Sequence, residues 1–117
     1  MSKVKTTTQN SKITFKVLSK KISAKKLHGF YQSALPGKTL NQCQDIIKKS
    51  SMIVGAFAGE KLIGIGRGLE DSVYAFITDV IVDRKFRKLG IGTKIVKILC
   101  EELMKKKIKI IHCSTEK

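Results

Sequence analysis

The sequence predicts an α+β fold whose elements follow the order strand-helix-helix-strand-strand-strand-helix-strand. Three observations support this class. Short apolar stretches rich in β-branched residues recur along the chain and predict strands. Two amphipathic stretches lie between the first and the second of these predicted strands. A basic, glycine-bearing turn joins one predicted strand to a long helix. With 117 residues, the chain can bury one core but not two.

The first half of the domain is predicted to contain one strand and two helices. Residues 1–12 are polar and are expected to form a flexible tail, so a single domain spans residues 13–117. Ile13–Val17 alternates well enough for a strand. Ser23–Ala34 has apolar residues spaced for one buried helical face, with a serine suited to the N-cap. Leu40–Lys49 is predicted to be a second, shorter helix.

The second half is predicted to contain four strands and one helix. Met52–Ala58 and Lys61–Leu69 form a hairpin around the turn at Gly59 and Glu60. Val73–Val82 is an apolar run that predicts a buried strand. A helix is expected to open near Thr93, and residues 108–113 form the last strand.

Three glycines alternate along the strand predicted at Lys61–Leu69. Gly64, Gly66 and Gly68 therefore share one face of the sheet. Close packing of a helix or of a cofactor against that face is the favoured interpretation, and bending of the strand is the alternative. A second phosphate loop is excluded because no helix follows.

The turn between the strand at 73–82 and the helix near Thr93 has the chemistry of an anion site. The first turn of a helix has unpaired N–H groups and carries the positive end of the helix dipole. Gly90 and Gly92 allow the backbone to approach a phosphate closely, while Arg87, Lys88 and Lys94 add positive charge. This arrangement predicts a phosphate-binding turn.

Two common phosphate motifs do not fit this turn. A Walker loop requires Gly, four residues and then Gly-Lys-Ser/Thr, whereas here Gly92 is followed by Thr and Lys in the wrong order. The dinucleotide fingerprint requires a third glycine in the helix, and none follows Gly92 there. The remaining pattern is Arg-x-x-Gly-x-Gly, from Arg87 to Gly92.

That pattern, placed between a strand and an amphipathic helix, resembles motif A of the GNAT superfamily of N-acetyltransferases. The resemblance extends over about residues 13–113 and is specific over Met52–Lys106. It implies a mixed, mostly antiparallel sheet with helices on both faces. It also implies that the cosubstrate is acetyl-coenzyme A (acetyl-CoA), held by the turn, and that no metal is needed.

The resemblance also implies which residues contact the cosubstrate. A bulge splays the strand before the turn from the next strand, and the pantetheine arm pairs with the free backbone in that gap, which here means Val80, Ile81 and Val82. The pyrophosphate is expected on the N–H groups after Arg87, which belong to Lys88, Leu89, Gly90, Ile91, Gly92 and Thr93. The N–H of Val80 would stabilise the developing oxyanion.

The acceptor side is less defined by the sequence. Asp79 is the best candidate for the base that deprotonates the amine, because it is an acid within an apolar strand. An equally good alternative is a bond from Asp79 to nearby backbone or to a lysine. Tyr74 and His112 are weaker candidates for the base, and the general acid is unassigned. The resemblance assigns the acceptor pocket to the first two helices and their loop, with Phe30, Tyr31 and Leu35, which are equally good core residues.

The chain departs from the family pattern at its C-terminal end. The family usually continues past the last predicted strand with another helix and two strands, including a tyrosine that protonates the departing thiolate, and this sequence ends at Lys117. The domain is therefore expected to be C-terminally short. A truncated chain, a natural short form, and completion by a second copy through the C-terminal strand all remain open, and the last predicts a possible homodimer.

Charge and composition narrow the function classes. The net charge is +15, which attracts polyanions such as CoA or nucleic acid. We predict a cytoplasmic N-acetyltransferase that moves the acetyl group of acetyl-CoA to a primary amine of a small molecule or a protein. The alternatives are a basic nucleic-acid-binding module, disfavoured because exposed aromatic residues among the basic ones are lacking, and an inactive CoA-binding fold. The absence of a long apolar run excludes a membrane span.

Overall fold

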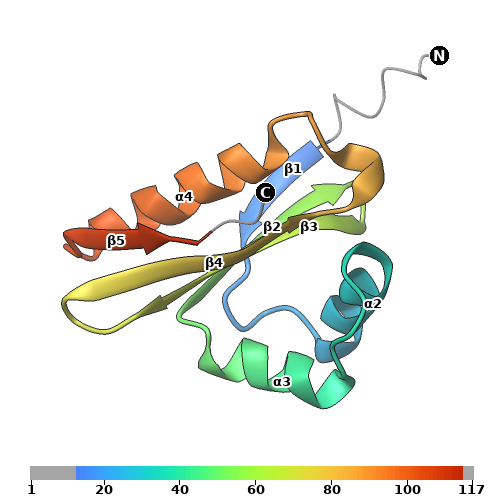
Figure 1. Ribbon diagram of the computed structural model, residues 1–117, viewed down its shortest axis with the longest axis horizontal. Coiled ribbons are helices and arrows are strands. Elements are labelled where there is room, and N and C mark those ends of the chain that lie inside the picture. Colours follow the sequence, from blue (N-terminus) through green and yellow to red (C-terminus); the bar gives the residue numbers. More distant parts are fainter. Residues whose placement is uncertain (1–12, 115–117) are drawn as a thin grey trace.

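The computed structural model describes residues 13–114 (Figure 1). The flexible tail predicted for residues 1–12 lies outside this range. The elements are β1 (Ile13–Val17), α2 (Ala24–Ala34), α3 (Leu40–Lys49), β2 (Met52–Ala58), β3 (Lys61–Glu70), β4 (Tyr74–Val82), the 3₁₀ turn η2 (Arg84–Phe86), α4 (Ile91–Lys105) and β5 (Ile110–Cys113). The predicted order of strands and helices is therefore confirmed.

The five strands form one sheet in the order β1-β2-β3-β4-β5. The first four pair antiparallel and β5 pairs parallel to β4, so the predicted mixed, mostly antiparallel sheet is confirmed. Helix α4 covers one face, and α2 and α3 cover the other (Figure 1). Strand β5 lies at an edge of the described sheet, which is where the predicted homodimer contact would form, and that contact stays a prediction.

Local sequence determines where the helices begin. The Ser23 hydroxyl accepts a hydrogen bond from the N–H of Lys26, as expected for an N-cap. Thr39 and Gln42 form a reciprocal capping box at the start of α3. Helix α4 starts at Ile91, two residues earlier than predicted, because Gly90 adopts a left-handed conformation that begins the helix. No helix of residues 13–114 is both long and apolar enough to cross a bilayer.

Two apolar clusters form the core, one on each face of the sheet. The cluster below α2 and α3 includes the fully buried side chains of Leu27, Tyr31 and Cys43. The cluster below α4 is formed by the buried helix residues at 91, 95, 99 and 103, packed on β2, β3 and β4. Because α4 lies over the middle of the sheet, its first turn is fixed at the end of β4.

The glycine face of β3 is where α4 packs, which confirms the helix-packing interpretation. A Cβ at Gly66 would lie 2.6 Å from Cγ2 of Ile95 and 3.1 Å from Cδ1 of Leu99. A Cβ at Gly64 would lie 3.3 Å from Cδ1 of Ile95. At Gly66 the helix therefore approaches the strand too closely for a side chain without a shift, and at Gly64 the space for a Cβ is tight.

We expect Gly66→Ala to lower the free energy of unfolding by about 1–3 kcal/mol, because α4 must move away from β3. Gly68→Ala is the matched control, since a Cβ there would make only ordinary contacts at 3.8 Å with Leu103, Leu99 and Met52. That control is expected to change stability by less than about 0.5 kcal/mol. Urea denaturation measures both, and equal stabilities of the two variants would contradict the close approach at residue 66.

The prediction that the strand at 73–82 is buried is wrong for Val73, Tyr74 and Phe76, which are exposed, and residues 78–82 are only half-buried. Val73 is 53% exposed and lies before the strand, while Tyr74 and Phe76 are 44% and 51% exposed. Only Ala75 and Ile77 are fully buried there. The physical reason is that α4 covers one face of this part of β4, whereas α2 and α3 pack farther along the sheet and leave the other face open.

Candidate cosubstrate and acceptor site

The pairing of β4 with β3 is interrupted by a bulge in β4 opposite Gly66. Ile81 pairs with Ile65 and Thr78 pairs with Arg67, so Asp79 and Val80 together oppose Gly66. Asp79 takes up the extra residue with a φ of +55°. Because side chains alternate along a strand, one additional residue moves every later side chain to the opposite face. The Asp79 side chain consequently points to the α2 side of the sheet, where it meets Tyr31.

The outer edge of β4 is open beyond the bulge. In the described residues β5 pairs only with Tyr74–Ile77, and the N–H of Ser114 donates to the carbonyl of Ile77. The N–H of Asp83 donates to the carbonyl of Ile63 on β3 at 2.7 Å, so alternation directs the backbone of Val82 toward the open edge. The Arg87 Nε–H donates to the Val82 carbonyl at 3.0 Å.

The basic turn encloses a hollow beside this edge. The hollow has a volume of about 240 Å³. Its lining contains seven of the ten residues predicted to bind the cosubstrate, plus Phe86: Val82, Phe86, Arg87, Lys88, Gly90, Ile91, Gly92 and Thr93. Of the other three, Leu89 is 46% exposed and lines a neighbouring depression, while Val80 and Ile81 pack against the two core clusters.

The hollow is electrostatically suited to an anion. Helix α4 starts at the edge of the hollow. No side chain caps the first turn of this helix, and no acidic residue lies in that turn. Gly90 has a φ of +79° and an added Cβ there would meet nothing within 4 Å, so the backbone is accessible. Free N–H groups at a helix N-terminus favour phosphate. The turn therefore fits a pyrophosphate, with Arg87 and Lys88 on its lining.

Asp79 is the centre of a polar cluster on the opposite face of the sheet. The Arg67 Nε–H donates to Asp79 Oδ2 at 2.9 Å, and the Tyr31 hydroxyl donates to the same oxygen at 3.2 Å. Arg67 Nη1 also donates to the Ser50 hydroxyl at 3.2 Å. The alternative of a bond to a lysine or the backbone is thus replaced by an arginine and a tyrosine, and the carboxylate is held in place.

Tyr31 is a stable hydrogen-bond donor in this cluster. Its burial, reinforced by the negative charge of Asp79, raises the pKa of Tyr31 above its usual range. The hydroxyl therefore keeps its proton across the physiological range. The Lys38 ammonium lies 4.5 Å above the Tyr31 ring. The hydrogen bond to Asp79 connects α2 to the bulge, and the Lys38 contact connects it to the α2–α3 loop.

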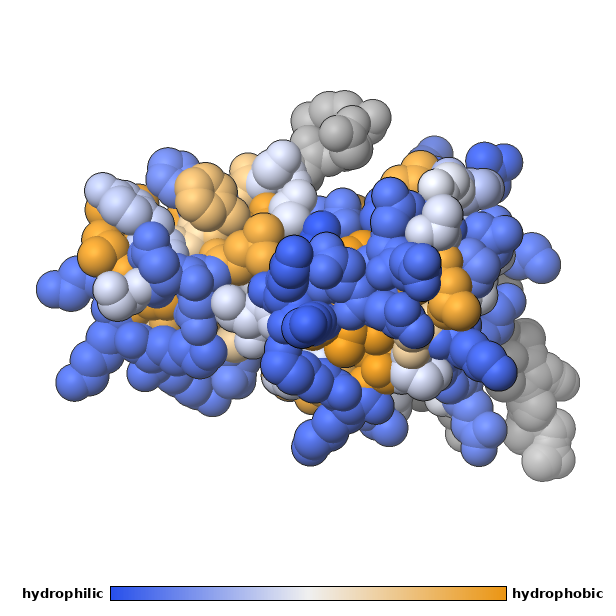
Figure 2. Space-filling model, turned by 90° about the horizontal axis from the view of Figure 1, so that it is seen from below, coloured by the Kyte–Doolittle hydropathy of each residue, from blue (hydrophilic) through white to orange (hydrophobic). Residues whose placement is uncertain are grey.

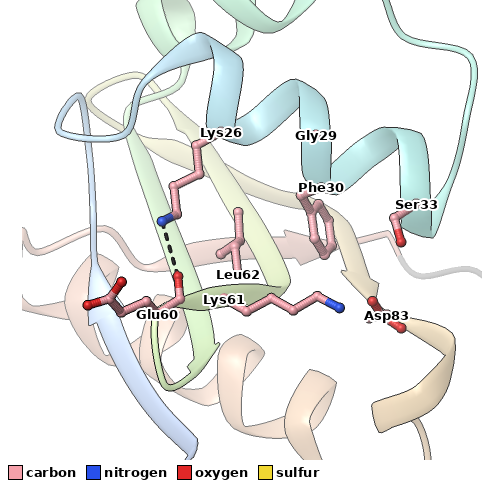
Figure 3. A pocket seen from close by; sticks show the side chains of 8 residues that line it. All are labelled: Lys26, Gly29, Phe30, Ser33, Glu60, Lys61, Leu62 and Asp83. Carbon is pink, nitrogen blue, oxygen red and sulfur yellow. Dashed lines mark hydrogen bonds between the residues drawn. The ribbon is translucent and has the colours of Figure 1, made fainter.

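The three predicted acceptor-pocket residues separate in the structure. Phe30 lines a cleft of about 230 Å³ between α2 and the β2–β3 hairpin, where the Lys26 ammonium donates to the Glu60 carbonyl at 3.1 Å (Figure 3). Leu35 is 48% exposed and lines a different depression beside the α2–α3 loop. Only Tyr31 contacts the Asp79 cluster.

The cleft of Figure 3 ends at the base of the phosphate turn. Lys61 extends across it from β3 toward Asp83, which is nearly buried. Asp83 Oδ1 accepts a hydrogen bond from the N–H of Lys85 and caps the turn η2. Asp83, which lines this cleft, therefore holds the turn that leads into the Arg87–Gly92 segment. The cleft lies farther along the chain of β4 than Asp79 does.

Arg67 and Ser50 are site residues that the sequence interpretation did not identify. The signal available for Arg67 was an arginine between two glycines of an apolar strand, on the side opposite the glycine face. Ser50 follows α3 and offered no signal. The weaker candidates Tyr74 and His112 lie together at the β4–β5 end of the sheet, where their ring centroids are 6.4 Å apart.

The fold and the site together define an α+β domain with a splayed strand, an anion-binding turn at a helix N-terminus, and a carboxylate held on the adjacent face. Residues 21–117 match the model of the acetyltransferase (GNAT) family. The chain belongs to this family. Its recognition from the Arg-x-x-Gly-x-Gly pattern is thereby confirmed.

Solved structures with the same fold include several acetyltransferases. A protein of unknown function from meticillin-resistant Staphylococcus aureus, described as a probable acetyltransferase, has a TM-score of 0.74 at 14% identity over 89% of this chain and 80% of its own. A GNAT family acetyltransferase from Streptococcus pneumoniae TIGR4 has a TM-score of 0.73 at 23% identity, and the match covers 90% of this chain and 76% of that chain.

A third similar structure is that of AAC(6')-Iy in complex with the bisubstrate analogue CoA-S-monomethyl-acetylneamine. Its TM-score is 0.71 at 16% identity, and the match covers 91% of this chain and 81% of that chain. At these identities the likeness is one of fold. A comparison with curated proteins found no significant match.

Proposed function

We propose that this protein transfers the acetyl group of acetyl-CoA to a primary amine by direct attack. The observation that carries the proposal is the open edge of β4 leading directly into the hollow of the basic turn. Val82 and the residues after Arg87 would hold the cosubstrate along that edge, with the pyrophosphate on the first turn of α4. The bound cosubstrate supplies the activated acetyl group.

In this proposal the hydrogen-bond donor for the oxyanion lies in the backbone of β4, and the base lies on the α2 face of the sheet. Val80 lies where the N–H of the bulged strand can donate to the oxygen on which charge develops. Asp79, on the other face, takes the proton from the attacking amine nitrogen, directly or through water. As the new C–N bond forms, the C–S bond breaks and the CoA thiolate leaves, to be protonated by a general acid that is unassigned.

Arg67 and Tyr31 act as positioning residues in this proposal. Both donate to Oδ2 of Asp79, which leaves Oδ1 as the oxygen that faces the acceptor. A cytoplasmic location is part of the same proposal, supported by the free Cys43, Cys100 and Cys113.

The proposal is tested by titrating acetyl-CoA calorimetrically into the full chain, followed by a thiol-release assay with a panel of primary amines. We expect micromolar binding and amine-dependent release of CoA thiol. Binding without release for any amine would favour the inactive CoA-binding alternative. Absence of binding at moderate salt would contradict the assignment of the turn.

A further inference from the structure

The cleft between α2 and the β2–β3 hairpin has no part in the proposed acetyl transfer. Figure 3 shows this cleft, whose volume is about 230 Å³. It shares no lining residue with the hollow of the basic turn, and none of Tyr31, Arg67 and Asp79 lines it. Pockets for drug-sized ligands usually measure about 300–1,000 Å³, so this cleft fits a smaller molecule.

A buried carboxylate lies at one end of this cleft. Asp83 is only 6% exposed, and its N–H is fixed by the hydrogen bond to the Ile63 carbonyl. Its Oδ1 accepts a hydrogen bond from the N–H of Lys85 at 3.0 Å. No ion pair within residues 13–114 includes Asp83, and its Oδ2 accepts no hydrogen bond from them. A carboxylate removed from water in this way is costly unless a cation joins it.

Two lysines bring the opposite charge to the same cleft. The Lys26 ammonium is held at the end away from Asp83, where it donates to the Glu60 carbonyl at 3.1 Å and so uses one of its three donors there (Figure 3). The exposed Lys61 extends across the cleft toward Asp83. The Glu60 carboxylate points away from Asp83 in the same view. Ammonium groups and a buried carboxylate therefore line one small volume.

The wall between the charged groups is apolar and short. Phe30 and Leu62, each 5% exposed, line the middle of the cleft. An added Cβ at Gly29 would meet no atom within 4 Å, so there is room beside α2. The surface on the side of α2 and α3 is mainly hydrophilic (Figure 2). A ligand therefore needs charged groups for recognition and can add a small apolar side chain.

We propose that this cleft binds a free α-amino acid with a small apolar side chain, as a site separate from the acetyl-transfer site. The ammonium group of the ligand donates to Oδ2 of Asp83, and its carboxylate accepts from the lysines. The apolar side chain lies against Phe30 and Leu62. A simple amine or a simple carboxylate satisfies only one of the two charges, so the zwitterion is preferred. Asp83 lies three residues beyond Val80, roughly 10 Å along an extended chain.

The test follows the backbone amide resonances of the full chain by NMR during titration with L-leucine, in the absence of acetyl-CoA. We expect saturable shifts at the cleft residues Gly29, Ser33 and Lys61. Two analogues of leucine each lack one charge: isoamylamine has no carboxylate, and isocaproate has no ammonium group. Each analogue is expected to bind at least about tenfold more weakly than leucine, because one buried or positioned charge of the cleft stays unpaired.

Two variants assign the charges. Asp83→Asn should weaken leucine binding at least about tenfold, because the amide keeps an oxygen for the N–H of Lys85 but carries no charge for the ammonium group. Lys61→Gln should weaken it about three- to tenfold. Lys25→Gln is the matched control, since Lys25 is exposed on α2 and does not line the cleft, and it should bind leucine as the wild type does.

The inference is overturned if leucine causes no saturable shifts, or shifts only outside the cleft. It is also overturned if either analogue binds as tightly as leucine, or if Asp83→Asn keeps the wild-type affinity. The Lys61→Gln variant gives an independent answer should Asp83→Asn lose the dispersed amide spectrum of a folded protein. No acetyl-CoA is present in these titrations, so their outcome leaves the acetyltransferase proposal to its own test.

Discussion

Replacing Gly90 with valine is expected to weaken acetyl-CoA binding at least about 100-fold. Gly90 has a φ of +79°, and an added Cβ would meet no atom within 4 Å, so the expected effect comes from the backbone conformation. A β-branched residue in the left-handed region costs about 1–2 kcal/mol. The chain relieves this strain by rotating residue 90, which moves the N–H groups of the first turn of α4. Loss of two hydrogen bonds to an anion costs about 3 kcal/mol or more.

Gly59→Val is the matched control for this prediction. Gly59 has a φ of +64° and also has open space around it, but it lies in the turn between β2 and β3. Both variants should lose similar stability in urea denaturation, and only Gly90→Val should lose binding in calorimetric titration. Equal affinity of the two variants for acetyl-CoA would mean that the turn is only a structural connection.

Replacing Asp79 with asparagine is expected to lower turnover about 10²- to 10⁴-fold, which is the usual contribution of a general base. Asparagine keeps the shape and one oxygen that accepts the hydrogen bonds of Arg67 and Tyr31, so the cluster keeps its geometry. It cannot take a proton from the amine. Because the Asp79 side chain lies on the α2 face of the sheet and not in the hollow of the basic turn, the affinity for acetyl-CoA should change by less than about threefold.

Glu101→Gln controls for the loss of one negative charge. Glu101 is exposed on α4, on the other face of the sheet, and its variant should keep full turnover. The measurement is the rate of thiol release at saturating acetyl-CoA, with the best amine of the panel. Full activity of Asp79→Asn would assign Asp79 a structural role and would direct attention to water or to another side chain as the base.

The helices and strands were largely predictable because their signals are local. Ser23, Thr39 and Gln42 cap helices through contacts within three residues. The two-residue turn at Gly59 and Glu60 follows from the conformational freedom of glycine. The start of α4 was misplaced by two residues, since the left-handed conformation of Gly90 rather than the polarity of Thr93 begins the helix.

The geometry of the Arg87–Gly92 turn was predictable as a unit because its residues are contiguous. Any backbone that runs from a strand through Arg87–Gly92 into a helix brings the same N–H groups together. The burial of β4 was not predictable from its apolar composition. Whether Tyr74 and Phe76 are covered depends on how far α2 and α3 extend below the sheet, which no local pattern encodes.

The sequence by itself therefore determined the order of elements, the family and the strand-turn-helix geometry at Arg87–Gly92, since each depends on neighbours along the chain. Only the tertiary structure decided what surrounds Asp79. Tyr31 lies far from Asp79 in the chain and meets it because α2 packs on the bulged strand, whereas Arg67 meets Asp79 through the pairing of β3 with β4. One additional residue in β4 turned Asp79 toward α2, and such a change of register is a property of paired strands rather than of either strand alone.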